Sequence, residues 1–530
     1  MTSYDGIVIG AGHNGLTCAA YLARAGLKIA VVERNAEIGG GCNTEEVTLP
    51  GFKHNLHSNY HFFEEGPVPR DLQLERYGLK YIYPEVQHAM VFRDGTAVCI
   101  HRDPQKTAAS FARFSKHDAD RYLELHDKFA VKMRNLANEM LYSNPLPLTE
   151  LAQRIRGPLG EELLRYNTLT LHEAVDQNFE EERIRSIFKI FLHAIALENA
   201  PNMGSFFPRL MGRLISLDFV AGGSFELARV LGKVIEEHGG TIISGKHVAG
   251  IEVKNGRATG IRLADGEVLE AKRFVASGVD APQTLRMVGE ENFGPVISEK
   301  LKHYKWANHS LVTLHLALNE PPAYTAAEFD PDVNRAFDVV LGADTSQDIV
   351  DGFEVIGRGD LPEKLIGNGC CNSRFENSNM APAGKHTAFW WPFAPYELRD
   401  GGAEAWDERK PEYTARLLKA WRAYAPNLNE QNVLGTYLFT PLDIERKCIN
   451  MVRGSHHVGA YLPSQVGASR PIPELSQYHT PVEGLYLCGA SSHSGGAISG
   501  SPGYNCANTI SEELEIPRWW TPLPSPQWEG

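Results

Sequence analysis

The first 41 residues constrain the fold of this chain more than any other stretch. Residues 4–33 contain a short apolar run, a glycine-rich turn, a helical pattern, a second apolar run and a closing acid. The spaced glycines are Gly10, Gly12 and Gly15, and the acid is Glu33. Glycines at this spacing between a strand and a helix, with an acid about 20 residues later, are the fingerprint of a βαβ unit that binds a dinucleotide. A glycine-rich turn in some other α/β unit is the alternative.

Each part of this fingerprint has a physical role. Gly10 allows a tight turn, Gly12 lets the backbone approach a pyrophosphate, and Gly15 lets the helix pack on the strand. The free N–H groups at the start of the helix attract phosphate. We expect Glu33 to accept hydrogen bonds from ribose hydroxyls and to disfavour a 2′-phosphate.

Composition narrows the class of protein. A chain of 530 residues exceeds the usual size of one compact core, so we expect two or more domains. The net charge of −13 argues against binding of nucleic acid through a basic face. The eight cysteines form no Cys-x-x-Cys pair and no zinc-ligand spacing. This pattern predicts reduced thiols, a cytoplasmic protein and no bound metal.

Two features bear on membranes. The first apolar run begins a few residues after Met1, so we expect no signal peptide, and no apolar run reaches the roughly 20 residues of a membrane-spanning helix. The tail, residues 517–530, is rich in Trp and Pro. It either contacts a partner subunit or a membrane surface, or forms an ordered coil over the protein, and both alternatives stay open.

Two segments follow the fingerprint. Glycines at residues 39–41 would bring backbone N–H groups close to a ligand, and residues 51–61 are dense in His and Asn. This continuation resembles the FAD-binding flavoproteins of the glutathione-reductase and amine-oxidase lineage. The resemblance implies that the glycines lie along the pyrophosphate and that His57, Asn59 and His61 face flavin or substrate. The alternative is that these side chains are satisfied hydrogen-bonding groups in a loop.

The middle of the chain alternates between helical and strand patterns. Residues 104–200 are helical in pattern, and we expect their aromatic and Met positions to be core. Residues 221–278 predict a helix, a strand and hairpins that end in a small-residue turn. This order resembles the second part of the FAD domain in the amine-oxidase-like superfamily, which implies that the backbone at Val248 meets the adenine half. The aromatic run of residues 387–396, which includes Trp391, either lines an apolar channel or packs a sheet against helices.

A strand, a glycine-rich loop and a helix follow near the C-terminus. The loop begins at Gly489 and contains Ile498, and a helix start aimed at flavin would stabilise negative charge on the reduced ring. Together with residues 441–446 and 470–475, this stretch closely resembles the phytoene desaturase-like (carotenoid oxidoreductase) family. That family commonly has His-Pro-Gly-Gly-Gly where this chain has His-Ser-Gly-Gly-Ala from His493. This departure leaves the FAD assignment intact but weakens the expectation of a polyene substrate.

These patterns predict an α/β fold with a Rossmann-like FAD-binding domain of the glutathione-reductase/amine-oxidase type and an interleaved α+β substrate domain. We expect the FAD-binding domain to comprise residues 1–85, 205–295 and 435–516, and the substrate domain residues 86–204 and 296–434. The residues expected to bind FAD are Gly10, Ala11, Gly12, Asn14, Gly15, Glu33, Arg34, Gly40, Gly41, Val248, Gly489 and Ile498.

The chain has no second dinucleotide fingerprint and no dithiol pair, so we do not expect a reductase fed by NAD(P)H. Aromatic segments with few clustered carboxylates suit hydride transfer, which depends on close geometry in a water-poor site. We therefore expect an FAD-dependent dehydrogenase or desaturase that moves hydride from a largely apolar small molecule to flavin N5. Asn59, His61 and Trp391 would contact the substrate. His57 and His493 would either assist as bases or only fix the loops around the ring.

Three other functions stay open. The first is an FAD-dependent amine oxidase. Amine oxidases of this superfamily often carry a lysine in a strand of the substrate domain, and residues 309–316 contain none, which makes this function less expected. The second is a redox-neutral polyene isomerase, and the third is a non-catalytic prenyl-protein escort factor that shares the fold. The electron acceptor (oxygen, a quinone or another carrier), a homo-oligomer and a peripheral membrane contact are left undecided by the sequence.

Overall fold

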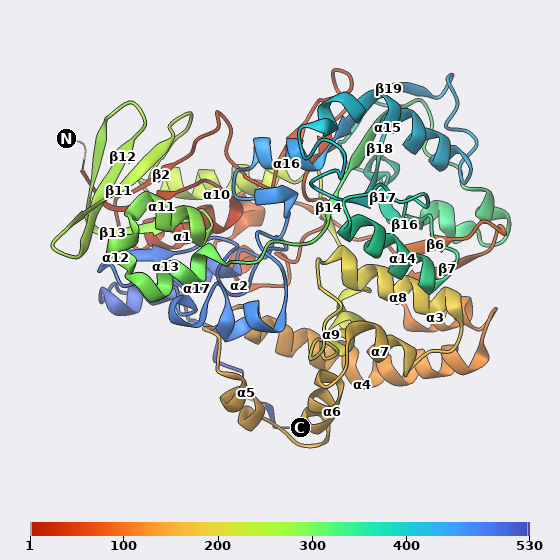
Figure 1. The fold of residues 1–530 in the computed structure, drawn as a ribbon, viewed down its shortest axis with the longest axis horizontal. Coiled ribbons are helices and arrows are strands. Elements are labelled where there is room, and N and C mark those ends of the chain that lie inside the picture. Colours follow the sequence, from red (N-terminus) through yellow and green to blue (C-terminus); the bar gives the residue numbers. More distant parts are fainter. Residues whose placement is uncertain (1–2, 527, 530) are drawn as a thin grey trace.

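Two β-sheets organise the protein, for which a computed structural model describes residues 3–526 and 528–529. Figure 1 shows the two sheets side by side, with a group of helices below the second sheet. Segments far apart in the sequence meet in each sheet, because the chain crosses between them several times. The arrangement confirms the predicted α/β fold class.

The first sheet has seven strands and carries the dinucleotide fingerprint. Its parallel strands are β10 (Thr241–Ile243), β2 (Ile29–Val32), β1 (Ser3–Ile9), β13 (Val268–Ser277) and β20 (Leu485–Leu487). An antiparallel pair, β12 (Arg257–Leu263) and β11 (Val248–Lys254), extends the sheet beyond β13. All of β2 is buried, which explains why it is continuously apolar rather than alternating.

Three helices pack together beside the first sheet. The helix α1 (His13–Arg24) contacts both α10 (Phe225–Glu237) and α17 (Ser501–Glu513). The contact between α1 and α17 depends on Gly503, because a Cβ atom there would lie 2.0 Å from the backbone oxygen of Asn14. This close approach brings the C-terminal helix against the N-terminal fingerprint.

The second sheet has eight strands. In spatial order seven of them are β19 (Val433–Phe439), β15 (Thr313–Leu318), β18 (His386–Ala394), β17 (Gly367–Cys370), β16 (Asp338–Leu341), β6 (Val86–Val91) and β7 (Ala97–His101). The eighth strand, β14 (Ser310–Leu311), also pairs with β18. Strand β19 runs across residue 434, where we expected the substrate domain to end. The second sheet therefore extends into the segment that we expected to bind FAD. The division into domains itself stays a prediction.

The aromatic run on β18 packs on both faces of the second sheet. Trp390 belongs to a buried cluster with Trp406 and Trp421 of α15 (Ala405–Arg422). Its neighbours Phe389 and Trp391 belong to the opposite cluster, which includes the helices that follow β7. This alternation is what a strand with period-two side chains dictates.

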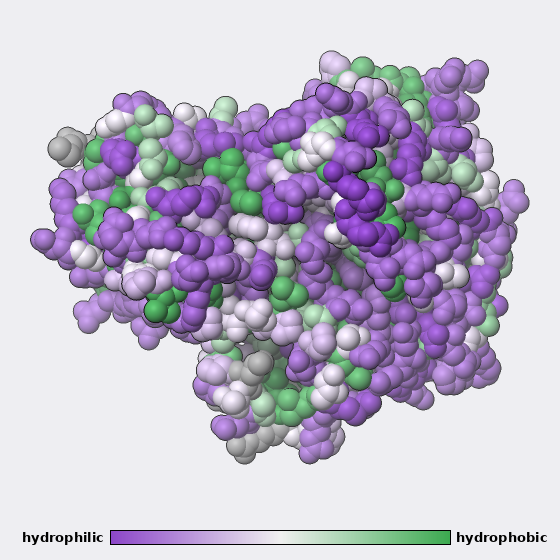
Figure 2. Space-filling model, viewed as in Figure 1, coloured by the Kyte–Doolittle hydropathy of each residue, from purple (hydrophilic) through white to green (hydrophobic). Residues whose placement is uncertain are grey.

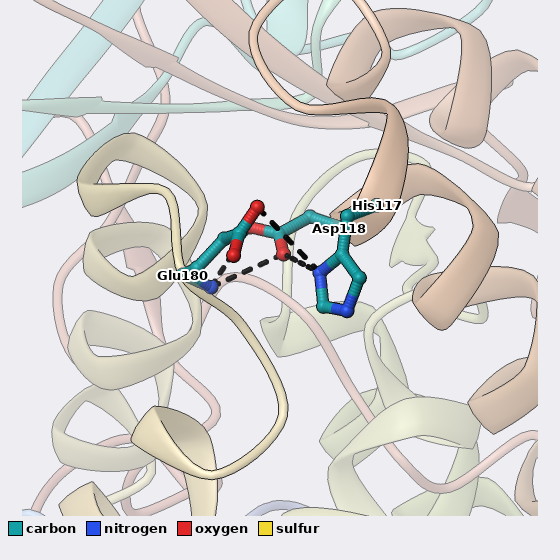
Figure 3. A group of neighbouring side chains, drawn as sticks. All are labelled: His117, Asp118 and Glu180. Atoms are coloured by element: carbon teal, nitrogen blue, oxygen red, sulfur yellow. Dashed lines mark hydrogen bonds and ion pairs between the residues drawn. The ribbon is translucent and has the colours of Figure 1, made fainter.

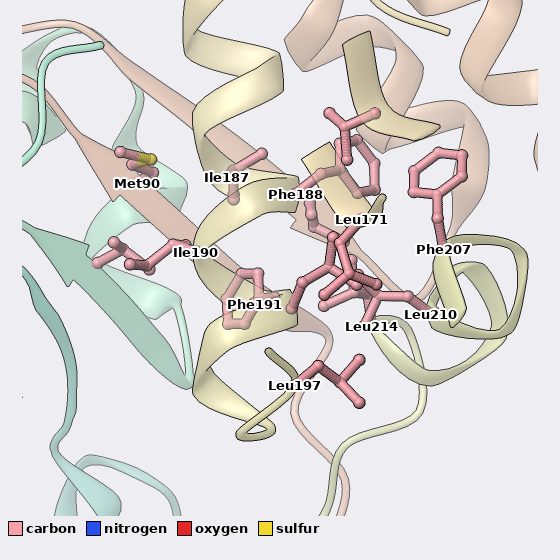
Figure 4. Packing of buried hydrophobic residues seen from close by; sticks show 14 of the residues in the cluster. Met90, Leu171, Ile187, Phe188, Ile190, Phe191, Leu197, Phe207, Leu210 and Leu214 are labelled. Atoms are coloured by element: carbon pink, nitrogen blue, oxygen red, sulfur yellow. The ribbon is translucent and has the colours of Figure 1, made fainter. Parts of the chain in front are cut away.

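The helices between residues 104 and 213 form a group below the second sheet (Figure 1). They are α3 (Pro104–Phe111), α4 (Lys116–Leu141), α5 (Leu148–Arg154), α6 (Pro158–Asn167), α7 (Leu171–Asp176), α8 (Glu182–Ala194) and α9 (Phe206–Arg213). Figure 4 shows apolar side chains of α8 facing those of α9, with Phe188, Phe207 and Leu210 among them. The prediction that this helical pattern is mainly core is confirmed by the burial of its aromatic and Met positions.

Shorter elements connect these parts. The remaining helices are α2 (Pro67–Asp71), α11 (Ala281–Val288), α12 (Glu290–Phe293), α13 (Pro295–Lys302), α14 (Ser346–Gly357) and α16 (Pro441–Lys447). Short paired strands are β3 (Thr44–Glu45) with β4 (His54–Asn55), β5 (Tyr81–Ile82) with β9 (Phe219–Val220), and β8 (Ile155–Arg156) with β21 (Trp528–Glu529). Among the described residues, no helix is both long and apolar enough to cross a membrane.

The Trp-rich tail packs on the first sheet's helices. The Trp519 ring stacks on Tyr21 at 5.3 Å, its Nε1 donates to the Tyr21 carbonyl at 3.1 Å, and the Arg24 guanidinium lies 3.8 Å from the indole centroid. Trp520 is buried and meets Tyr21 edge-on. Both indoles are therefore engaged by the chain itself, as expected for an ordered coil. Figure 2 shows a mostly hydrophilic face on which apolar residues form small separate groups.

Candidate active site

A cavity of about 300 Å³ lies where β1 and β2 end. It gathers residues from both ends of the chain, as the fingerprint and the closing loop predicted. Of the residues expected to bind FAD, those that line it are Gly10, Gly12, Asn14, Gly15, Glu33, Arg34, Gly40, Gly41, Val248 and Ile498. Ala11 and Gly489 are not among its lining residues.

The start of α1 offers free donors to this cavity. Gly12 occupies the N-cap position of the helix. Because glycine has no side chain, no side-chain oxygen accepts a hydrogen bond from the first N–H groups of the helix. A Cβ atom at Gly12 would meet nothing within 4 Å, whereas one at Gly15 would lie 2.3 Å from the Gly10 carbonyl oxygen. Gly12 therefore leaves room in the cavity, and Gly15 permits the turn to pack.

Two buried polar atoms beside these glycines have no hydrogen-bond partner in the described chain: Asn14 Oδ1 and His13 Nε2. Burial lowers the pKa of His13 to about 4, so this ring is neutral at pH 7. Unpaired buried polar atoms are costly, and a polar ligand at this point would satisfy them.

Glu33 links the two halves of the fingerprint. One of its carboxylate oxygens accepts a hydrogen bond from the Ala11 backbone N–H at 2.8 Å, and the other accepts one from the Asn35 N–H at 2.8 Å. The side chain is buried and also lines the cavity. Ala11 thus contributes by fixing the turn to Glu33 rather than by lining the cavity.

The second glycine cluster lies against the first. The Gly39 N–H donates to the Ala11 carbonyl at 2.8 Å, and a Cβ atom at Gly40 would lie 3.1 Å from the Cα of Gly12. Gly489 serves a similar packing role, because a Cβ atom there would be 2.5 Å from the Gly278 carbonyl oxygen. These close backbone approaches build the walls of the cavity.

A second, smaller cavity of about 70 Å³ adjoins the first. The two cavities share the lining residues Gly41, Met451, His456, Ala497 and Ile498. His57, Asn59 and Trp391 line the smaller cavity, and their contact with a substrate stays a prediction. Among the described residues that line it, none is a lysine, an arginine or a carboxylic acid.

Two histidines singled out in the sequence lie outside both linings. His61 is buried and shares a hydrogen bond of 3.1 Å with the Ser224 hydroxyl. His493 is buried, and its Nε2 lies 2.9 Å from the Met140 carbonyl oxygen. Their contacts are those of residues that fix loops, which was the alternative role named for His493.

His57 and Asn59 keep unpaired atoms at the smaller cavity. His57 Nε2 lies 3.5 Å from Cys448 Sγ, and its Nδ1 is buried with no hydrogen-bond partner among the residues that the structure describes. Burial, helped by the positive charge of Lys447, lowers the pKa of His57 to about 3, so the ring is neutral. The Asn59 Oδ1 accepts hydrogen bonds from Asn55 and Asn372, which leaves its Nδ2 as an unused donor.

His456 and His457 also line the smaller cavity, and neither was singled out in the sequence. The available signal was a pair of adjacent histidines between Gly454 and Gly459. Nothing local distinguishes this pair from surface histidines, because its position depends on contacts with distant segments.

A separate group of potential metal ligands lies at the start of α4 (Figure 3). His117 Nδ1 is 3.1 Å from Asp118 Oδ1 and 3.8 Å from Glu180 Oε1. The buried Asp118 carboxylate already accepts hydrogen bonds from the backbone N–H groups of Glu180 and Glu181. Asp118 therefore ties a loop to the helix, and none of these residues lines either cavity.

Comparison with known proteins identifies the family. A model described as an NAD(P)-binding Rossmann-like domain matches residues 8–71. One of the subunits of limonene dehydrogenase from Castellaniella defragrans is 32% identical over 98% of this chain and 96% of its own length. This chain belongs to the phytoene desaturase-like family of FAD-dependent oxidoreductases. The resemblance noted at the closing loop is confirmed.

Two further similarities were found. The 4,4′-diaponeurosporene oxygenase of Staphylococcus aureus is 26% identical over 51% of this chain and 55% of its own length. The structure of putrescine oxidase bound to putrescine has a TM-score of 0.62 and 15% identity, covering 97% of this chain and 99% of that one. The latter is a likeness of fold. As a phytoene desaturase-like protein, this chain is an FAD-dependent oxidoreductase.

Proposed function

We propose that this chain holds FAD in the larger cavity and dehydrogenates a largely apolar organic molecule in the smaller one. The observation that supports this is the junction of the two cavities. A cavity built on a dinucleotide fingerprint shares five lining residues with a neighbouring cavity whose described lining residues include no lysine, arginine or carboxylic acid. A cofactor in the first and a substrate in the second would meet at those residues.

The residues of the larger cavity fit FAD. Glu33 and Val248 would hold the ribose and adenine end, the uncapped start of α1 would bind the pyrophosphate, and Gly41 and Ile498 would adjoin the flavin. The unpaired Asn14 Oδ1 would gain a partner. When bound, FAD supplies a two-electron acceptor for hydride.

The chemistry of the smaller cavity supports an uncharged substrate. The described residues that line the cavity include no carboxylic acid to offset the lost hydration of a cationic amine, and the aromatic rings of Tyr60, Phe62 and Trp391 give an apolar substrate surface to pack on. Asn59 Nδ2 and Trp391 Nε1 are unpaired donors that would orient a substrate or a water molecule. The relatives named for limonene and diaponeurosporene act on apolar compounds, as their names state, which also favours this class.

The test is an anaerobic titration of the purified protein with a fixed panel: limonene, a linear polyene, a cyclic ketone and an amine. We expect a yellow protein whose flavin absorbance is bleached by an apolar member of the panel and not by the amine. A Gly12→Leu variant should be colourless, because its side chain would enter the cavity. A wild-type protein that stays colourless after soaking with FAD contradicts the cofactor, and bleaching by the amine alone contradicts the substrate class.

The remaining partners are part of this proposal. Oxygen, a quinone or another carrier would reoxidise the flavin, and the return of absorbance after adding each one to bleached enzyme identifies which. Sizing by light scattering distinguishes a homo-oligomer from a monomer. Flotation with lipid vesicles tests a peripheral membrane contact.

A further inference from the structure

His456 occupies a special position in the site. It lines both cavities, and both of its ring nitrogens are buried without a hydrogen-bond partner among the described residues. His57 and His457 line only the smaller cavity. His315 also has two unpaired ring nitrogens, but it lines neither cavity. His456 therefore combines free ring nitrogens with a place where the cofactor and the substrate would meet.

The segment that carries His456 is held rigidly by Arg470. The guanidinium group of Arg470 is fully buried and donates hydrogen bonds to the carbonyls of His457 and Val458, each at 3.0 Å. It also donates to the Ala490 carbonyl at 3.0 Å, in the glycine-rich loop. A second anchor is Ser310, whose hydroxyl donates to the Gly454 carbonyl at 2.8 Å. A residue on such a fixed segment can be positioned for chemistry.

We infer that His456 is the base that takes the proton lost by the substrate during dehydrogenation. This inference rests on the proposed function. One carbon of the substrate loses hydride, with its electron pair, to the flavin. The neighbouring carbon loses a proton to an unprotonated ring nitrogen of His456, and the electron pair of that C–H bond becomes the new double bond. The substrate is oxidised by two electrons, the flavin is reduced by two, and the imidazole gains one proton.

A weak base is sufficient for this step. Once hydride has begun to leave, the substrate becomes electron-poor and its neighbouring C–H bond becomes acidic. Burial, together with the nearby rings of His309 and His57, lowers the pKa of His456 to about 3, so the imidazole stays neutral and able to accept a proton. The same surroundings favour its rapid deprotonation afterwards.

The first experiment compares His456→Gln with His315→Gln in the anaerobic bleaching assay. His315 is the matched control, since both of its ring nitrogens are likewise buried and unpaired among the described residues but it lies outside the cavities. We expect His456→Gln to bind FAD and to slow bleaching by about 100-fold or more, the usual contribution of a general base, and His315→Gln to stay within about threefold of wild type. Bleaching by His456→Gln at the wild-type rate overturns the inference. If no compound bleaches the wild-type protein, the proposed function has failed instead.

A second measurement does not depend on turnover. In protein labelled with ¹⁵N-histidine, the signals missing from His456→Gln identify that ring. We expect a neutral ring at pH 6 whose ¹⁵N shifts change when FAD is added, whereas the His315 signals stay in place. A His456 signal that is protonated at pH 6, or that does not respond to FAD, contradicts its assigned position and role.

Discussion

Replacing Glu33 with Gln tests how the fingerprint is held together. The Glu33 carboxylate accepts two backbone hydrogen bonds, from Ala11 and from Asn35, each at 2.8 Å. A glutamine keeps one acceptor oxygen, and its NH₂ group would face the N–H that the other oxygen had accepted. One charge-assisted hydrogen bond is lost and one buried N–H is left unpaired, at a cost of about 1.5–3 kcal/mol.

Part of this cost should appear as weaker binding of FAD. The Ala11 N–H belongs to the turn that would cradle the pyrophosphate, so a displaced turn loses contacts with the cofactor. If the whole cost of about 1.5–3 kcal/mol appeared in binding, the affinity would fall by roughly 10- to 150-fold, which is the upper limit of the expected loss. The hydrogen bonds also exist without the cofactor, so the FAD-free variant should unfold at a lower temperature than FAD-free wild type.

The assay is quenching of FAD fluorescence on binding to cofactor-free protein. Glu37→Gln is the matched control, because Glu37 is exposed a few residues away and changes the net charge equally. It should bind FAD like wild type. An affinity of Glu33→Gln within twofold of wild type would show that the carboxylate does not organise the cavity, and would refute the role assigned to its two hydrogen bonds.

Three further outcomes are expected. Gly503→Ala should lower the free energy of unfolding by about 1–3 kcal/mol in denaturant titrations, because its Cβ would meet the backbone of α1, whereas Gly357→Ala, which has open space around it, should be close to neutral. Trp519→Ala should loosen the tail, which limited proteolysis would detect, since its stacking on Tyr21 is lost. Thermal stability should fall as pH drops below about 6.5, by up to about 1.4 kcal/mol per pH unit per histidine, because only the unfolded state takes up protons until pH reaches about 3. The buried histidines whose pKa is lowered to about 3 in this way include His54, His57 and His61.

Much of the cofactor site was predictable because its determinants are local. The turn through Gly10, Gly12 and Gly15 follows from backbone conformation and close packing within some twenty residues. The closing glycine-rich loop carries a pattern strong enough to identify the family. The order of strand, helix and strand likewise predicted the first sheet.

The substrate side was less predictable because its residues have no local signature. His493 sits in a conspicuous motif, yet its ring lies by the Met140 carbonyl and lines neither cavity. His456 sits in an unremarkable segment, yet Arg470 holds that segment at the junction of the two cavities. The aromatic run on β18 was ambiguous, since only the packed sheet shows that Trp390 and Trp391 face opposite sides.

The sequence by itself determined the dinucleotide-binding turn and the α/β class, because these depend on residues adjacent in the chain and on backbone geometry. The tertiary structure decided which histidines line the smaller cavity and where the two cavities join. Those positions arise from contacts between segments more than 100 residues apart, such as Ser310 with Gly454 and Asn14 with Gly503. Long-range packing of this kind leaves no periodic pattern in the sequence that forms it.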